Sequence, residues 1–507
     1  MCGNGPNTSL LLFVQWRRDR EHCGAGSGEA IASHFIGCGS VGDCGLRQRF
    51  RWDPPTAPNF PPTIAPTTAP ARPSPSPTVT PAAGATPEAQ ARTLPTPSPS
   101  VQIQPGDDAN MSARIQRIVS GIVPFGEDGQ LHFIGEDGQP HWNEGAELAD
   151  RMRHCGVPGV SFAVIEGHEV AWAEGHGTLR SGGDTRVTSM TLLHAGSTAK
   201  MVSAAGSLNL VKRGLLALDE DVNDKLSSWH IPDGEFTQQE KVTLRRLLSH
   251  SGGLEYGFTN RSSGDAVPEY FTPGGVAPSV TLQQLLDAEP GIDVDGLTRV
   301  TAVPGSQYRY SNADYAILEL LIRDVTGKPF PTFMQETILG PLGMTSSTYD
   351  QPLPPDLRAR AAIEHDHLGE AVPGDRLHIP LLAAGGLWTT PSDMARFVIE
   401  LMDSYRGKSQ QVLDRAMTSE MFSAQIGIPQ NPLADSAGLG IQLSGEGKDL
   451  SMVHTGSTFG STAIVWAYPE TGQGAIIMTN SATGSLLRLE TLIGIARVFG
   501  WPLEPGP

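Results

Sequence analysis

Two pairs of short segments in the second part of the chain are rich in residues that favour β-strands. Val160 to Ile165 and Glu169 to Glu174 flank Glu166-Gly167, a pair that predicts a hairpin turn. Ser461 to Tyr468 and Ala475 to Asn480 flank a turn that contains proline and glycine. The pattern therefore predicts one β-hairpin before residue 180 and a second one close to the C-terminus.

Between and after these strands, apolar residues recur at helical spacing. A helix is predicted from Ser197 to Gly214, where two cations precede a C-cap glycine, on the apolar positions Met201, Ala205, Leu208 and Val211. Ser485 to Phe499 predicts an amphipathic helix that ends at a glycine. Ser392-Asp393 predicts the N-cap of a helix over Met394 to Leu401. Strands at both ends with helices between them predict an α+β fold, in which an antiparallel sheet is covered by helices.

The first 108 residues differ in composition from the rest of the chain. Sixteen of the 41 prolines fall between Pro54 and Pro105, mixed with Thr, Ser and Ala. Such a segment buries too little apolar surface to offset its ordering entropy, so it predicts a disordered tether. We therefore expect a poorly ordered leader over residues 1–53, a linker over residues 54–108 and one folded domain over residues 109–507.

Composition narrows the classes of partner. The chain has 507 residues, and 54 acidic against 36 basic residues give a net charge of −18. A surface this negative repels phosphate backbones, so nucleic acid is not an expected partner. No apolar run reaches the roughly 18–20 residues that cross a bilayer, so no transmembrane segment is predicted. The tether would suit a protein held outside the cytoplasm, but no signal peptide is legible.

Cysteine and histidine give no clear metal signature. Zinc ligation by Cys23, Cys38, Cys44 and His34 would lack a close C-x-x-C pair, and incidental thiols in a leader are the alternative. Cys155 predicts a small buried residue. His365-Asp366-His367 could suggest a metal site, but it lies in a Gly- and Pro-rich stretch that resembles a hairpin turn. We expect no metal and no cofactor.

The first chemical motif is Ser197-Thr198-Ala199-Lys200, the one S-x-x-K in the chain. Residues three apart share a helical face, so the Lys200 amine can reach the Ser197 hydroxyl. A serine hydroxyl becomes a strong nucleophile when a neighbour takes its proton, and a lysine can do this if burial keeps its amine neutral. The motif favours an activated serine; an ordinary surface helix is the alternative.

Two further motifs supply partners for such a serine. Tyr310-Ser311-Asn312 offers a phenol that can relay a proton and an amide that can hold substrate or orient Lys200. His454-Thr455-Gly456 precedes the C-terminal hairpin, where an edge strand could line a cleft. Thr455 offers a hydroxyl, and Gly456 allows close backbone approach. The backbone N–H groups of Ser197 and Ser457 could together form an oxyanion hole. His250-Ser251-Gly252 has a similar pattern to the third motif, but it lies before Tyr310 and so has the wrong order for the strand role.

In the order S-x-x-K, Y-x-N and H-T-G, these motifs resemble the penicillin-recognising serine hydrolases. The similar branch holds class C β-lactamases, D-alanyl-D-alanine carboxypeptidases and related esterases. Segments over residues 243–254, 340–347 and 384–397 extend the resemblance, which covers roughly residues 112–500. It implies a β-lactamase/transpeptidase-like fold, with an antiparallel sheet flanked by helices plus an all-helical region.

The resemblance also implies roles for individual residues. Ser197 would be acylated, Lys200 would be the base and Tyr310 the second proton-transfer group. Asn312 would position substrate, and His454 and Thr455 would line the strand side. The third motif reads H-T-G where class C β-lactamases carry K-T-G, so charge support for a substrate carboxylate is less certain.

These features lead to one expectation and two alternatives. We expect a serine hydrolase that acts through an acyl-enzyme on an ester or amide bond of a small molecule or peptide, and that is peptidase-like or esterase-like. The alternatives are a β-lactamase and a non-catalytic domain that binds penicillin or cell-wall peptides. The oligomeric state and the substrate identity stay open.

Overall fold

The computed structural model describes residues 109–122, 146–254, 271–274, 276, 280–287, 299–429 and 431–502. The predicted leader and linker, including the cysteines near the N-terminus, lie outside these residues. None of the described helices is both long and apolar enough to cross a membrane.

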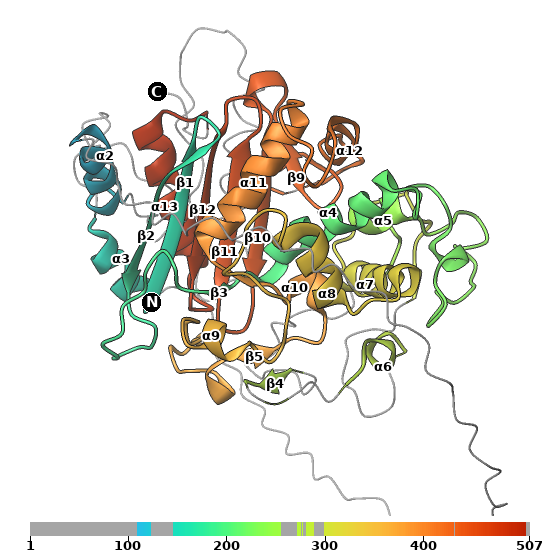
Figure 1. Cartoon of the computed structure of the whole chain (residues 1–507), viewed down its shortest axis with the longest axis horizontal. Helices are drawn as coiled ribbons and strands as arrows, with labels where there is room; N and C mark the ends of the chain where they lie inside the picture. Colours follow the sequence, from blue (N-terminus) through green and yellow to red (C-terminus); the bar gives the residue numbers. More distant parts are fainter. Residues whose placement is uncertain are drawn as a thin grey trace, which may run out of the picture. The chain divides into compact units, whose positions relative to one another are not determined.

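An eight-stranded antiparallel sheet forms the centre of the described region (Figure 1). Its strand order is β2-β1-β12-β11-β10-β9-β8-β7. The strands are β1 (Gly159–Glu166), β2 (Glu169–Gly177), β7 (Ile426–Gly427), β8 (Ser436–Ala437), β9 (Gln442–Ser444), β10 (Ser451–Ser457), β11 (Thr462–Tyr468) and β12 (Gln473–Thr479). The first and last long strands of the chain, β1 and β12, are neighbours in the sheet, so the two ends of the folded region close on each other.

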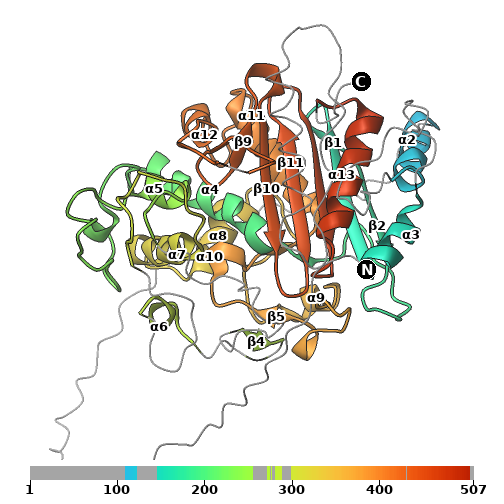
Figure 2. The same ribbon diagram turned by 180° about the vertical axis from the view of Figure 1, so that it is seen from behind.

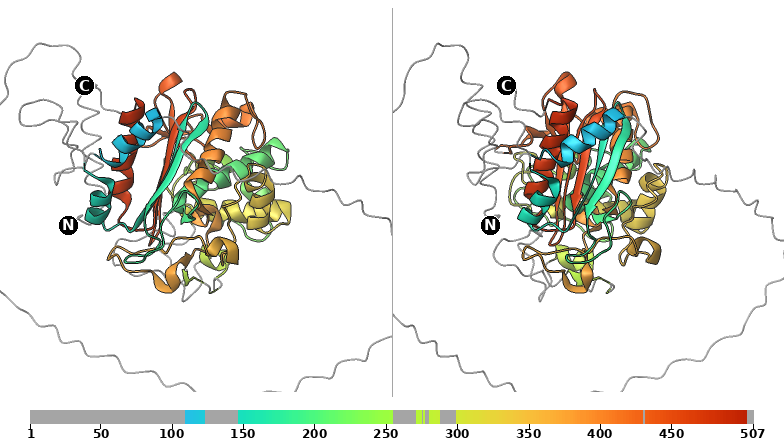
Figure 3. Two further views of the ribbon diagram at one scale, coloured as in Figure 1. Left: turned by 60° about the vertical axis from the view of Figure 1, so that its left-hand side comes forward. Right: turned by 90° about the vertical axis from the view of Figure 1, so that its left-hand side faces the viewer.

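Helices cover both faces of the sheet. On one face α13 (Ser485–Phe499) packs on β11 and β12, with α2 (Ala109–Val119) and α3 (Leu148–Cys155) beside it (Figure 2). On the other face α11 (Pro391–Tyr405) packs on β1, β2 and β12. Figure 3 shows these layers nearly edge-on. The predicted α+β class is confirmed.

Alternate residues of a strand pack into two separate hydrophobic cores, because successive side chains of a β-strand point to opposite faces of the sheet. On β11, Val465 belongs to the core beneath α11, whereas Ile464 and Trp466 belong to the core beneath α13. Cys155 is buried in the second core, as predicted. A sheet that is covered on both faces needs apolar residues at successive positions, which is why these strands read as continuous apolar runs.

A helical region lies beside the β10 side of the sheet (Figures 1 and 2). It contains α4 (Ala199–Lys212), α5 (Leu244–Leu248), α6 (Leu282–Leu286), α7 (Asn312–Thr326), α8 (Phe330–Met334) and α10 (Leu382–Gly385). The central helix α4 is buried over most of its length. Small residues allow this, since a Cβ added to Gly206 would lie 2.8 Å from Met334 Sδ.

The shorter elements connect these layers. They are β3 (Leu193–His194), which pairs with β6 (Trp388–Thr389); β4 (Thr272–Pro273), which pairs with β5 (Leu377–His378); α9 (Pro355–Arg358); and α12 (Arg415–Met421). The β3–β6 pair matters for the site, because β3 leads directly into the segment that carries Ser197.

Both predicted hairpins are confirmed, with small changes at their turns. β1 and β2 are joined by Gly167 and His168, whose φ angles are +59° and +67°, and Glu166 is still paired in the ladder. Two consecutive residues with positive φ match the twist of a tight hairpin. β12 begins at Gln473, two residues before the predicted start.

The helix predictions hold with two differences. The helix after Ser197 ends at Lys212, and Gly214, two residues later, has φ +70°, as expected for a glycine that ends a helix. Helix α13 has the predicted bounds, but it is buried on more than one side because α2 packs against its outer surface. The N-cap predicted at Ser392-Asp393 is wrong. Thr390 caps α11 and accepts a hydrogen bond from Asp393 N at 3.1 Å, because Pro391 takes the first helical position.

Candidate active site

Ser197 and Lys200 meet at the start of α4. Ser197 lies in a 3₁₀ turn, η1 (Gly196–Thr198), that runs directly into the helix, and it is partly accessible. Lys200, one turn later, is fully buried. The Lys200 Nζ lies 3.2 Å from the Ser197 Oγ. The spacing expected from the S-x-x-K motif therefore brings the amine and the hydroxyl within hydrogen-bond distance.

The surroundings of the Lys200 amine favour its neutral form. Burial lowers the pKa of Lys200 to about 7, although Asp314 opposes this. Nζ also donates to Asn312 Oδ1 at 2.8 Å and to the Ala384 carbonyl at 2.7 Å. Both of these partners are acceptors. A neutral amine has two hydrogens and one lone pair, so when the two acceptors take both hydrogens, the lone pair is available to the Ser197 hydroxyl.

The Y-x-N motif approaches this pair from α7. Asn312 is the first residue of that helix, whose N-cap Ser311 accepts a hydrogen bond from Ala313 N at 3.1 Å. The Lys200 Nζ lies 5.0 Å from the centre of the Tyr310 ring. Residues more than 100 positions apart in the chain thus converge on one amine.

The H-T-G motif forms the end of β10, beyond its pairing with β9. β9 pairs with β10 only as far as Val453, so among the described residues the end of β10 has no strand partner on that side and lies next to η1. A Cβ added to Gly456 would lie 2.1 Å from the Ala195 carbonyl oxygen, and one added to Gly196 would lie 2.8 Å from Ser457 N. Only glycine allows the two backbones to approach this closely. The approach brings the segments that carry the Ser197 and Ser457 N–H groups together.

His454 is uncharged in this environment. Its side chain is buried, and its Nδ1 donates to the Thr455 carbonyl at 2.8 Å. Burial, together with the nearby Lys200, lowers the pKa of His454 to about 3. The third motif therefore brings a neutral imidazole, not a cation, to the site. Thr455 is partly accessible on the same strand edge, and its contact with substrate stays a prediction.

His250 contacts the site, although its sequence order excluded it from the strand role. It follows α5 and does not lie on a strand, as expected. Its ring centre is 4.3 Å from that of Tyr310, and its Nδ1 is 2.8 Å from Asp314 Oδ2. No local feature of the sequence links His250 to Tyr310.

Glu364 is a second buried group that the sequence did not single out. Its Oε1 lies 3.1 Å from His194 Nδ1 and accepts hydrogen bonds from Thr458 Oγ1 and Ser461 Oγ at 2.9 and 3.2 Å. Burial alone would raise the pKa of Glu364, but His194 and the other donors hold it below its usual value. Glu364 thus joins β3, which precedes Ser197, to the segment that follows Ser457.

His365, part of the weak metal motif, has hydrogen-bond partners for both ring nitrogens. Its Nε2 accepts from Ser181 N at 3.0 Å, and its Nδ1 lies 2.9 Å from the Asn480 carbonyl oxygen. These contacts give His365 a structural role between separate segments of the chain.

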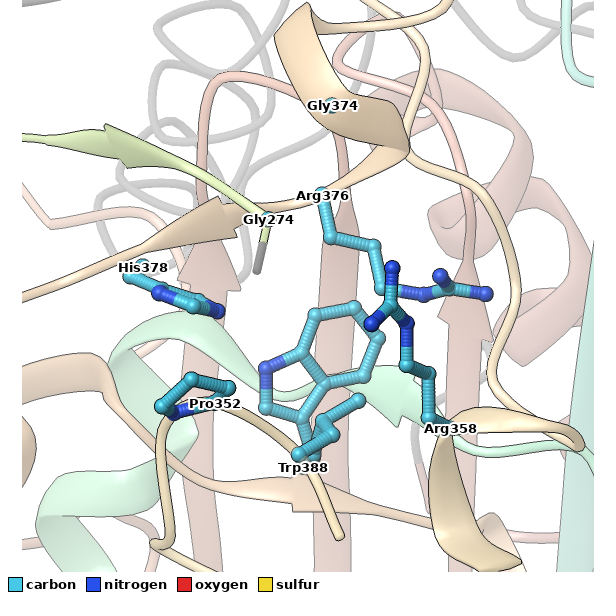
Figure 4. Close-up of a pocket in the computed structure, with 8 residues that line it drawn as sticks. Gly274, Pro352, Arg358, Gly374, Arg376, His378 and Trp388 are labelled. Atoms are coloured by element: carbon cyan, nitrogen blue, oxygen red, sulfur yellow. The ribbon is translucent and has the colours of Figure 1, made fainter. Parts of the chain in front are cut away.

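A pocket lies near β5 and α9 (Figure 4). Arg358, Arg376, His378 and Trp388 are among its lining residues. The Trp388 ring also stacks on His194, with ring centres 4.7 Å apart. The wall of this pocket therefore supports the strand that leads to Ser197, but none of the predicted site residues lines it.

Comparison with known proteins identifies a matching protein family and similar penicillin-binding and carboxypeptidase proteins. Residues 146–497 match a family model described as Beta-lactamase. The chain is 28% identical to penicillin-binding protein 4 of Amycolatopsis lactamdurans over 391 residues, which cover 72% of this chain and 94% of that protein. It is 25% identical to the D-alanyl-D-alanine-carboxypeptidase/endopeptidase AmpH of Escherichia coli K12 over 331 residues, which cover 64% and 79% of the two chains.

Solved structures support the same fold. The octameric penicillin-binding protein homologue from Pyrococcus abyssi matches with a TM-score of 0.57 and 22% identity, covering 70% of this chain and 76% of that one. At this level of identity the likeness shows the fold alone.

Proposed function

Because the chain belongs to the beta-lactamase family, whose members are serine hydrolases that act through an acyl-enzyme, we propose that Ser197 is the acylated nucleophile and Lys200 its base. One observation carries this proposal: a fully buried amine whose two other partners are acceptors faces the Ser197 hydroxyl at 3.2 Å. An ordinary surface lysine would be charged at neutral pH and would have no lone pair to offer.

The proposed reaction has two halves. Lys200 takes the Ser197 proton as Oγ attacks the carbonyl carbon of the substrate, and the N–H groups of Ser197 and Ser457 stabilise the oxyanion. Tyr310 passes a proton from the lysine to the leaving alcohol or amine, and the bond to that group breaks. A water molecule then attacks the acyl-enzyme, releases the acid and restores the Ser197 hydroxyl.

Substrate binding uses the two walls beside the serine. Asn312 holds Lys200 and a polar group of the substrate, while His454, Thr455 and Gly456 line the strand side. Gly456 keeps β10 close to the segment that carries Ser197, so an extended substrate that lies along this strand edge, as in peptide recognition at a sheet edge, is next to the nucleophile.

The uncharged third motif favours substrates that do not depend on a carboxylate at this position. A lysine in place of His454 would present a positive charge to the carboxylate of a β-lactam, but His454 has a pKa of about 3 and stays neutral. We therefore propose an esterase-like or peptidase-like hydrolase with weak or no β-lactamase activity.

A hydrolysis panel tests this function. Purified protein would be assayed on p-nitrophenyl esters, D-alanyl peptides and nitrocefin, with Ser197→Ala as the control. We expect turnover of esters or D-alanyl peptides that the control lacks. Efficient turnover of nitrocefin, with poor action on the other two classes, would contradict the substrate preference. A serine that is labelled by a fluorescent penicillin but turns over none of the three would favour the binding-domain alternative.

A further inference from the structure

His250 accepts hydrogen bonds from the residues on both sides of Tyr310. The Arg309 N–H donates to the His250 carbonyl at 2.7 Å, and the Ser311 N–H donates to the His250 Nδ1 at 3.3 Å. The His250 ring itself lies against the Tyr310 ring, with centres 4.3 Å apart. The backbone on each side of the phenol is therefore fixed relative to His250.

Asp314 fixes the imidazole in turn. Its Oδ2 lies 2.8 Å from the His250 Nδ1, and both side chains are buried. Burial raises the pKa of the Asp314 carboxyl and lowers the pKa of the His250 imidazole. Asp314 lies in the first turn of α7, two residues after Asn312, so the same contact also fixes the start of the helix that presents Asn312 to Lys200.

The backbone of His250 adopts a conformation that few residues accept. Its φ is +54°, in the left-handed region where glycine and asparagine are at an advantage. Neighbouring bonds maintain this conformation: Ser251 N–H donates to the Arg246 carbonyl at 2.8 Å, and Gly305 N–H donates to the Ser251 carbonyl at 2.7 Å. A histidine placed here contributes a side chain that reaches both Ser311 and Asp314, which glycine cannot do.

We propose that His250, anchored by Asp314, is a positioning residue that sets the phenol of Tyr310 and the amide of Asn312 against the Ser197–Lys200 pair. It does not touch the reacting atoms. This inference rests on the proposed function, because it assigns His250 to the proton-transfer step of the same reaction. Misplacing such a group by about 1 Å can cost on the order of 100-fold in rate.

Three variants separate positioning from general stability. His250→Gly accepts the positive φ and keeps the carbonyl that Arg309 uses, but it removes the imidazole. His250→Asn also accepts the positive φ, and its Oδ1 stands where Nδ1 was, so it can still accept the Ser311 N–H. His168→Gly is the matched control, because His168 is another histidine at positive φ, in the β1–β2 turn away from the site.

The readouts are kcat and KM on a p-nitrophenyl ester, together with the melting temperature. We expect His250→Gly to lower kcat about 10- to 100-fold with KM changed less than about threefold. We expect His250→Asn to recover most of the lost kcat and His168→Gly to match the wild type. Wild-type kcat in His250→Gly, or equal losses in the glycine and asparagine variants, would overturn the positioning role.

Failure of the proposed function is distinguishable from failure of this inference. If Ser197→Ala keeps wild-type ester turnover, the nucleophile is misassigned, and the role of His250 falls with it. If Ser197→Ala is inactive and His250→Gly is fully active, only the positioning role is wrong.

Discussion

Placing a negative charge beside the Lys200 amine should move the pH dependence of the reaction. Asn312→Asp makes this change with almost no change in volume, because the new carboxylate oxygen replaces the amide oxygen that lies 2.8 Å from Nζ. Lys200 has a pKa of about 7, so about half of it is neutral at pH 7. A neighbouring carboxylate stabilises the ammonium form and so raises this pKa.

The size of the effect follows from the separation of the charges. Two unit charges about 4 Å apart interact by about 4 kcal/mol at an effective dielectric of about 20, which corresponds to about 3 in pKa. Desolvation of the new carboxylate opposes this, since Asn312 is half-buried. We therefore expect the Lys200 pKa to rise by about 1 to 3, and kcat/KM at pH 7 to fall by at least about 5-fold.

The assay is kcat/KM on a p-nitrophenyl ester between about pH 5.5 and 10.5, corrected with Ser197→Ala. The wild-type rate should rise with pH through about 7, and the Asn312→Asp rate should rise only at higher pH. The matched control is Asn209→Asp, because Asn209 lies on α4 with Lys200 but nine residues, or about 13 Å, farther along the helix. Its charge acts more than three times more weakly by distance alone. An acid limb that stays near pH 7 in Asn312→Asp would refute Lys200 as the titrating base.

Three further predictions follow from the same site. Between pH 7 and about 10, the free energy of unfolding should rise with pH more steeply in the wild type than in Lys200→Met, because an amine with a lowered pKa binds fewer protons in the folded state than in the unfolded state. Urea titrations at several pH values measure this free energy. Equal slopes of unfolding free energy against pH in the two proteins would contradict the buried neutral amine. Gly456→Ala should lower kcat on the order of 100-fold, since its Cβ would lie 2.1 Å from the Ala195 carbonyl oxygen and must displace β10; near wild-type kcat would contradict the close approach. His454→Lys should increase nitrocefin turnover relative to p-nitrophenyl ester turnover, and an unchanged ratio would show that charge at this position does not set the preference.

The sequence predicted best those features that depend on neighbouring residues. The contact between Ser197 and Lys200 needs only the spacing of a helix, and the paired strands at Gly159–Glu166 and Glu169–Gly177 need only composition and a short turn. The predicted N-cap of α11 was wrong, because T-T-P-S-D offers both Thr390 and Ser392 as caps, and Pro391 at the first helical position selects Thr390.

Contacts between distant segments were beyond such patterns. The motif chemistry suggested that Asn312 could orient Lys200, but the meeting of these segments followed from the family resemblance, because periodicity does not say which loops meet. The pairs His250–Asp314 and His194–Glu364 carry no local signature at all. Their residues are 64 and 170 positions apart, and burial brings them together.

Trapping the acyl-enzyme would identify directly the residue that the substrate acylates. The protein would be quenched with acid during turnover of a slowly hydrolysed p-nitrophenyl ester, digested with trypsin and analysed by fragment-ion mass spectrometry. Cleavage after Arg186 and Lys200 releases a peptide that carries Ser197 together with Ser189 and three threonines. We predict one acyl group on Ser197 and none in Ser197→Ala. An acyl group on another residue, or undiminished turnover without Ser197, would contradict it.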